Sequence, residues 1–105
     1  MKTYTTTVIE MTSEELAERF KKFVKENTGY EGEVRVGFDS DDEGEILVEV
    51  IMNLTDDQEC KLEEAGVCPM PPAIGYDLLY QIYGDDVRNF EFGDTENEIR
   101  ITIFK

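Results

Sequence analysis

Glu98-Ile99-Arg100-Ile101-Thr102-Ile103-Phe104 is the stretch that decides the fold. Its isoleucines occupy every second position, which is the period of a β-strand with one buried face. A second alternating stretch, Arg88 to Phe92, precedes it, and the residues between them, Gly93 to Asn97, are of the kinds that form turns. We therefore predict a closing β-hairpin whose isoleucines face the core.

Residues 32–53 show the same alternation on both sides of an acidic turn. Val34, Val36 and Phe38 alternate before the turn, and the apolar residues from Ile46 to Met52 alternate after it. This pattern predicts a second hairpin. Leu47 and Ile51 add apolar residues to the other side of its second strand, and with Tyr4 and Phe104 they are expected on a sheet face turned away from the core.

The remaining segments predict one more strand and three helices. Residues 3–10 alternate as a strand does. Thr12 and Thr55 are each followed three residues later by Glu or Gln, a pattern typical of helix starts, and glycines 29 and 66 stand where those helices would end. A third helix follows the proline-rich connector and ends near Tyr83.

The element order is therefore strand, helix, strand, strand, two helices, strand, strand. Short connections and hairpin turns favour antiparallel pairing. We predict an α+β fold in which a single layer of mainly antiparallel sheet, of about five strands, packs against two or three helices. At 105 residues with 40% apolar content, residues 1–105 are expected to form a single domain.

Acidic residues are concentrated in one part of the chain. Residues 1–30 hold five acids and five bases, whereas residues 31–105 hold twenty acids and five bases, so the whole net charge of −15 lies in the second segment. Such a surplus attracts cationic partners and repels nucleic acid and anionic membranes. The partner is therefore expected to be a basic protein, with no direct binding of nucleic acid or membrane.

Two groups of residues are candidates for binding that partner. The acidic candidates lie in the turn of the first hairpin and around the last hairpin: Asp39, Asp41, Asp42, Glu43, Glu45, Glu91, Glu96 and Glu98. The aromatic candidates share a narrow arc of the third helix: Tyr76, Tyr80 and Tyr83. A tyrosine stripe suits partner recognition as well as packing at the edge of a core, and the sequence leaves both open.

The acidic turn also resembles the start of a calcium loop of the EF-hand type. Asp39, Asp41 and Glu43 occupy the first, third and fifth positions, and Gly44 occupies the sixth. The resemblance ends at Val50, which stands where a bidentate glutamate is needed. We expect a solvated turn, with weak calcium binding as the alternative.

The sequence argues against catalysis and cofactors. It has no histidine, and it has no glycine-rich phosphate loop following a strand. Cys60 and Cys68 lie among acids, which disfavours a reactive thiolate, and they lack the spacing of a zinc or redox pair. A non-catalytic protein with free thiols and a cytoplasmic location is expected, without a cofactor.

These observations predict a binding protein whose acidic surface, formed by residues 31–105, engages a basic site on a protein partner. An ordered row of carboxylates could imitate a nucleic-acid backbone and inhibit a DNA- or RNA-binding protein. Anti-restriction and anti-CRISPR proteins of phages and mobile elements use this strategy, which is an analogy of strategy and not of sequence. The alternative is a homo-oligomeric scaffold, a homodimer for example, that associates through the tyrosine helix or the outer sheet face.

Overall fold

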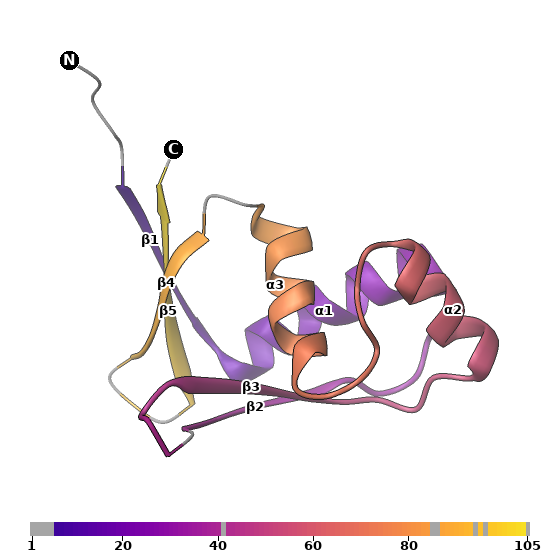
Figure 1. Ribbon diagram of the computed structural model, residues 1–105, viewed down its shortest axis with the longest axis horizontal. Coiled ribbons are helices and arrows are strands. Elements are labelled where there is room, and N and C mark those ends of the chain that lie inside the picture. Colours follow the sequence, from indigo (N-terminus) through magenta and orange to yellow (C-terminus); the bar gives the residue numbers. More distant parts are fainter. Residues whose placement is uncertain (1–5, 41, 85–86, 94, 96, 105) are drawn as a thin grey trace.

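The computed structural model describes residues 6–40, 42–84, 87–93, 95 and 97–104. Its elements follow the predicted order (Figure 1): β1 (Thr6–Thr12), α1 (Ser13–Thr28), β2 (Arg35–Ser40), β3 (Ile46–Ile51), α2 (Asp56–Glu64), α3 (Ala73–Tyr83), β4 (Val87–Phe92) and β5 (Glu98–Phe104). All strand pairs are antiparallel. The predicted α+β class, element order and antiparallel pairing are thus confirmed.

The five strands form two sheets rather than the one continuous layer expected from the sequence. β5 lies between β1 and β4 in a three-stranded sheet, and β2 pairs with β3 in a two-stranded sheet. Helix α3 and the start of α1 lie on one side of the three-stranded sheet, α2 lies at the far end of the molecule, and the β2–β3 hairpin runs beneath the helices (Figure 1). The edges of β3 and β4 therefore face the same region of the molecule without pairing.

Helix α3 explains why β3 does not pair with β4. The hydroxyl of Tyr76 donates a hydrogen bond to the backbone carbonyl of Ile46, so one acceptor on β3 already has a helical partner. One residue earlier, Gly75 lies so close to β3 that a Cβ there would stand 2.9 Å from Val48 Cβ and closer still to the Val48 carbonyl oxygen. The helix thus takes the place beside β3 that a neighbouring strand would need.

The core lies where the two sheets meet the helices. The predicted inward isoleucines of β5 are all buried, with Ile99 and Ile101 fully so. The same core cluster contains apolar side chains from each helix: Leu16, Phe20 and Val24 from α1, Leu62 from α2, and Ile74, Leu78 and Leu79 from α3. The alternation read from the sequence therefore identifies the buried face of the central strand.

The helix boundaries agree with the capping signals in the sequence. Thr12 accepts a hydrogen bond from the backbone N–H of Glu15, and Gly29 ends α1 in the left-handed conformation. At α2, Thr55 and Gln58 form a reciprocal capping box. In the part of the chain that the structure describes, no helix has the length and apolarity needed to cross a membrane.

Candidate partner-binding site

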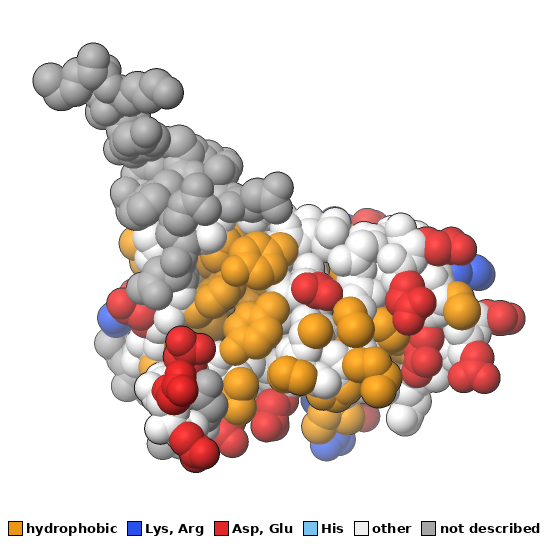
Figure 2. Space-filling model, viewed as in Figure 1, with side chains coloured by type: hydrophobic (Ala, Val, Ile, Leu, Met, Phe, Trp, Pro, Cys, Tyr) orange, Lys and Arg blue, Asp and Glu red, His pale blue; other side chains and the backbone are white. Residues whose placement is uncertain are grey.

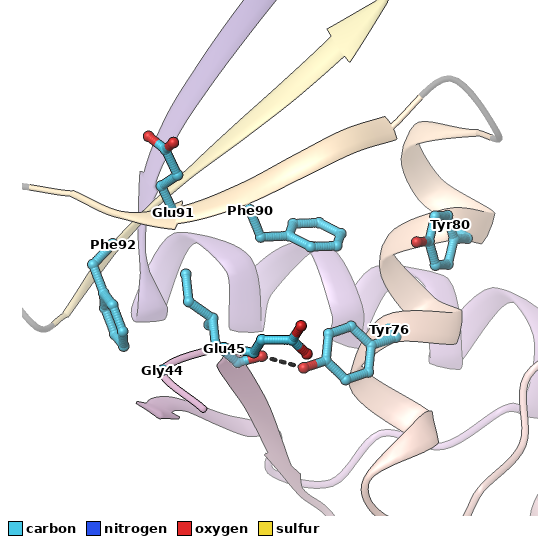
Figure 3. A pocket seen from close by; sticks show the side chains of 8 residues that line it. Gly44, Glu45, Tyr76, Tyr80, Phe90, Glu91 and Phe92 are labelled. Carbon is cyan, nitrogen blue, oxygen red and sulfur yellow. Dashed lines mark hydrogen bonds between the residues drawn. The ribbon is translucent and has the colours of Figure 1, made fainter. Parts of the chain in front are cut away.

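An open groove of about 660 Å³ lies between the start of β3, helix α3 and strand β4. We call it the aromatic groove, and its lining residues are Gly44, Glu45, Ile46, Tyr76, Tyr80, Phe90, Glu91 and Phe92. Figure 3 shows β4 on one side, the beginning of β3 on the other and α3 closing one end. The groove thus occupies the space that the divided sheet leaves between its two edges.

Phe90 is the central ring of the groove. Its centroid lies 6.1 Å from that of Tyr76, with the planes tilted by 49°, and 6.3 Å from that of Tyr80, in an edge-to-face arrangement at 71°. Tilted and edge-to-face contacts at these distances are favourable for aromatic rings. Since Tyr80 remains 41% exposed, the cluster presents ring surface to solvent.

Strand alternation explains which side chains of β4 reach the groove. Phe90 pairs with Ile101 and Phe92 pairs with Ile99, and directly paired residues share a sheet face. Both phenylalanines therefore lie on the helix side of the sheet, as Figure 3 shows, whereas the side chain of Glu91 points away from the rings. Glu91 pairs with Arg100, whose Nε lies 2.7 Å from a carboxylate oxygen of Glu10.

Two of the predicted acids, Glu45 and Glu91, line the groove, and only the carboxylate of Glu45 is directed toward its rings. Glu45 immediately precedes β3, and its carboxylate reaches toward the Tyr76 ring (Figure 3). The neighbouring acids Asp39, Asp42 and Glu43 are exposed around the same turn, where Asp39 accepts a hydrogen bond from the backbone N–H of Ser40 at 2.8 Å. The turn therefore places several carboxylates beside an aromatic surface.

The remaining predicted acids are Glu98, Asp41 and Glu96, and none of them lines the groove as the structure describes it. Glu98 begins β5 and accepts a hydrogen bond from the Thr95 hydroxyl at 3.0 Å. Asp41 and Glu96 lie outside the described residues. In Figure 2, acidic side chains gather at the corner of the β2–β3 hairpin and over α2, with an apolar patch between them over α3.

The three tyrosines of α3 have different environments. Tyr80 presents its ring to the groove and solvent, and Tyr76 uses its hydroxyl to hold β3. Tyr83 is half-buried, and its hydroxyl lies 3.6 Å from the sulfur of Met11. The stripe is therefore divided: Tyr83 packs at the edge of the core, whereas Tyr80 lies on the exposed surface.

Burial of Tyr83 predicts a loss of stability at high pH. Desolvation raises the pKa of its phenol above the ordinary value of 10.0; nearby Arg19 acts in the opposite direction, and Glu15 adds to the rise. Above about pH 10 the unfolded tyrosine loses its proton while the folded one keeps it, so the free energy of unfolding falls until the folded pKa is passed. Below pH 10 both forms are protonated, and Tyr83 adds no pH dependence.

We expect Tyr83→Phe to flatten the fall in unfolding free energy above about pH 10, measured by denaturant titration between pH 8 and 11. Tyr80→Phe is the matched control, since that ring is exposed. An unchanged alkaline slope in Tyr83→Phe would show that burial of this phenol does not contribute to it.

The predicted outer-face residues that the structure describes belong to two different sheets. Leu47 and Ile51 lie on the outer face of the two-stranded sheet, where Ile51 is 64% exposed and Glu49 stands between them. Phe104 belongs to β5 of the other sheet, and Tyr4 lies outside the described residues. Leu47 and Ile51 are therefore in a different sheet from Phe104.

The structure describes no metal site. Within residues 6–40, 42–84, 87–93, 95 and 97–104, no group of three His, Cys, Asp or Glu side chains is placed to hold an ion. Asp39 and Glu43 of the calcium-like loop lie in this part of the chain, whereas Asp41 does not. Cys60 and Cys68 are free and exposed.

Of the residues that line the groove, the acidic and tyrosine patterns predict Glu45, Glu91, Tyr76 and Tyr80 but not Phe90 and Phe92. Their alternation was visible in the sequence as a strand. The signal that could have indicated their role is the presence of two phenylalanines on one face of β4, which is an edge strand of its sheet. That position depends on the separation of β3 from β4, which no local pattern encodes.

No known protein family, no characterised protein and no solved structure matches this chain.

Proposed function

We propose that this chain is a non-catalytic binding protein that engages a basic site on a protein partner through its acidic surface. The observation that carries the proposal is the position of the aromatic groove next to the acidic β2–β3 turn. Aromatic surface supplies contact area, and the surrounding carboxylates select a cationic partner and steer its approach.

The charge distribution supports a partner that combines basic and apolar groups. On the face in Figure 2, an apolar patch separates two acidic regions, at the hairpin corner and over α2. A basic site with an apolar centre complements that arrangement. A DNA- or RNA-binding protein is the narrower form of the proposal, in which the chain would compete with nucleic acid for the partner's Lys/Arg surface.

Homo-oligomerisation through α3 is the second candidate, and the exposed ring of Tyr80 favours it. It predicts a dimer whose stability is insensitive to salt, because apolar contacts are not screened. Light scattering after size exclusion at about 50 and 500 mM NaCl separates the candidates. A monomer at both salt concentrations contradicts the oligomer.

The main test is binding of a fluorescent decapeptide of alternating lysine and glycine. We expect its affinity for the wild-type protein to fall at least tenfold between about 50 and 300 mM NaCl. Neutralising the turn with Asp42→Asn, Glu43→Gln and Glu45→Gln should weaken binding at low salt by about fivefold or more. A peptide in which glutamate replaces lysine should not bind.

A matched control removes the same charge from α1. Glu14→Gln, Glu18→Gln and Glu26→Gln change three exposed acids outside residues 31–105. If both triple variants lose the same affinity for the lysine–glycine peptide, only the net charge of the protein matters and the position of the acids does not. An affinity that salt does not change would contradict the proposed mechanism.

A further inference from the structure

We infer that the aromatic groove is an arginine-binding subsite: it accepts a guanidinium group from an extended basic segment of the protein partner. This inference rests on the proposed function and makes it more specific. The occupant is one side chain of defined chemistry, and the site consists of Tyr76, Tyr80, Phe90 and Phe92 with Glu45.

The rings supply the first half of the recognition. Cations bind over aromatic faces within about 6 Å of the ring centroid. Phe90 meets its two tyrosine neighbours at 49° and 71°, so the rings do not stack face to face and cover one another. The groove is open to solvent and Tyr80 is 41% exposed, so a planar group can reach a ring from outside.

Glu45 supplies the second part of the recognition, a carboxylate that can accept hydrogen bonds from the guanidinium. Its carboxylate lies at the Tyr76 side of the groove (Figure 3), next to the exposed acids of the turn. A guanidinium can stack on a ring with its plane while its N–H groups donate to a carboxylate at its edge. Lysine offers a compact, strongly hydrated ammonium without that planar surface, so the site should distinguish arginine from lysine at equal charge.

The shape of the site fits an extended segment. The groove lies between β3 and β4, which are edge strands of two sheets, with the aromatic rings at its centre (Figure 3). A segment that enters from the open end would pass the acidic turn and reach the rings, because α3 closes the opposite end (Figure 3). A segment with several basic residues would then bind through the general field of the acids and place one arginine in the groove.

The experiment compares three decapeptides that differ at one central position. Each contains alternating lysine and glycine with central arginine, lysine or the neutral arginine isostere citrulline, and affinities are measured by fluorescence anisotropy at about 150 mM NaCl. The arginine peptide should bind about five- to thirtyfold more tightly than the lysine peptide. The citrulline peptide should be the weakest.

Variants show whether the groove is responsible. Tyr80→Leu should abolish the preference for arginine while leaving the salt dependence of lysine-peptide binding intact. Phe90→Leu provides a second test from another element, and Ile51→Ala is the matched control, because Ile51 is an exposed apolar residue outside the groove. In NMR spectra, ring resonances of Tyr80 and Phe90 should shift with the arginine peptide more than with the lysine peptide.

The outcomes separate this inference from the proposed function. Equal binding of the arginine and lysine peptides, still weakened by salt and by the turn variants, overturns the arginine subsite and leaves the acidic-surface proposal standing. An arginine preference that survives both Tyr80→Leu and Phe90→Leu also overturns it. Failure of all three peptides to bind at about 50 mM NaCl contradicts both proposals.

Discussion

Gly75→Ala is expected to lower the free energy of unfolding by about 2 kcal/mol, although the same change in an exposed helix usually raises it by up to about 1 kcal/mol. The reversal follows from the closeness of α3 to β3. A methyl group at Gly75 would meet the carbonyl and side chain of Val48, so helix and strand would have to separate. Urea unfolding followed by circular dichroism measures the change.

The same substitution should disturb the aromatic groove. Tyr76 follows Gly75 directly, and its hydrogen bond to Ile46 would be lost if the helix moved away. Gly37→Ala is the matched control, because a Cβ at Gly37 in β2 meets nothing within 4 Å. The control should change stability by less than about 0.5 kcal/mol. Equal stability of Gly75→Ala and wild type would contradict the close packing of α3 on β3.

Ile101→Ala should have the largest effect of any substitution considered, a loss of about 3 kcal/mol in the free energy of unfolding. Ile101 is fully buried at the centre of β5, between Ile9 of β1 and Phe90 of β4. Removing its side chain leaves a cavity among residues that cannot all close around it. For a domain whose total stability is about 5–15 kcal/mol, this is a large fraction.

Chemical denaturation at pH 7 measures this loss. Val8→Ala is the control: Val8 lies on the opposite face of the same sheet and is 55% exposed, so a change below about 0.5 kcal/mol is expected. Phe90, directly opposite Ile101, should also show broadened ring resonances in the Ile101→Ala protein. If Ile101→Ala and Val8→Ala lower the free energy of unfolding by the same amount, the assignment of the buried face of this sheet is wrong.

Local patterns in the sequence predicted every element of the fold. Alternation in Glu98 to Phe104 identified the buried isoleucines, and capping residues such as Thr12 and Thr55 marked the helix starts. These signals lie within a few neighbouring residues, and the physical forces behind them act over the same short range. The class and order of elements could therefore be predicted correctly.

The division into two sheets could not be predicted in this way. It depends on contacts between residues far apart in the chain: Tyr76 with Ile46, and Gly75 with Val48. In the sequence, Gly75 has no visible role, and Tyr76 is one member of a stripe. The aromatic groove follows from that division, which is why Phe90 and Phe92 could not be predicted as site residues; Glu45, Glu91, Tyr76 and Tyr80 could, because local acidic and tyrosine patterns mark them.

The contact of α3 with β3 also affects how copies of this protein meet. An open strand edge is a template on which a second chain can extend a sheet, the usual first step of fibril growth. On the edge of β3, the Tyr76 hydroxyl donates a hydrogen bond to the Ile46 carbonyl, and the backbone of α3 at Gly75 lies against the Val48 carbonyl. Together with mutual repulsion between molecules of charge −15, this shielding should prevent the edge of β3 from acting as such a template.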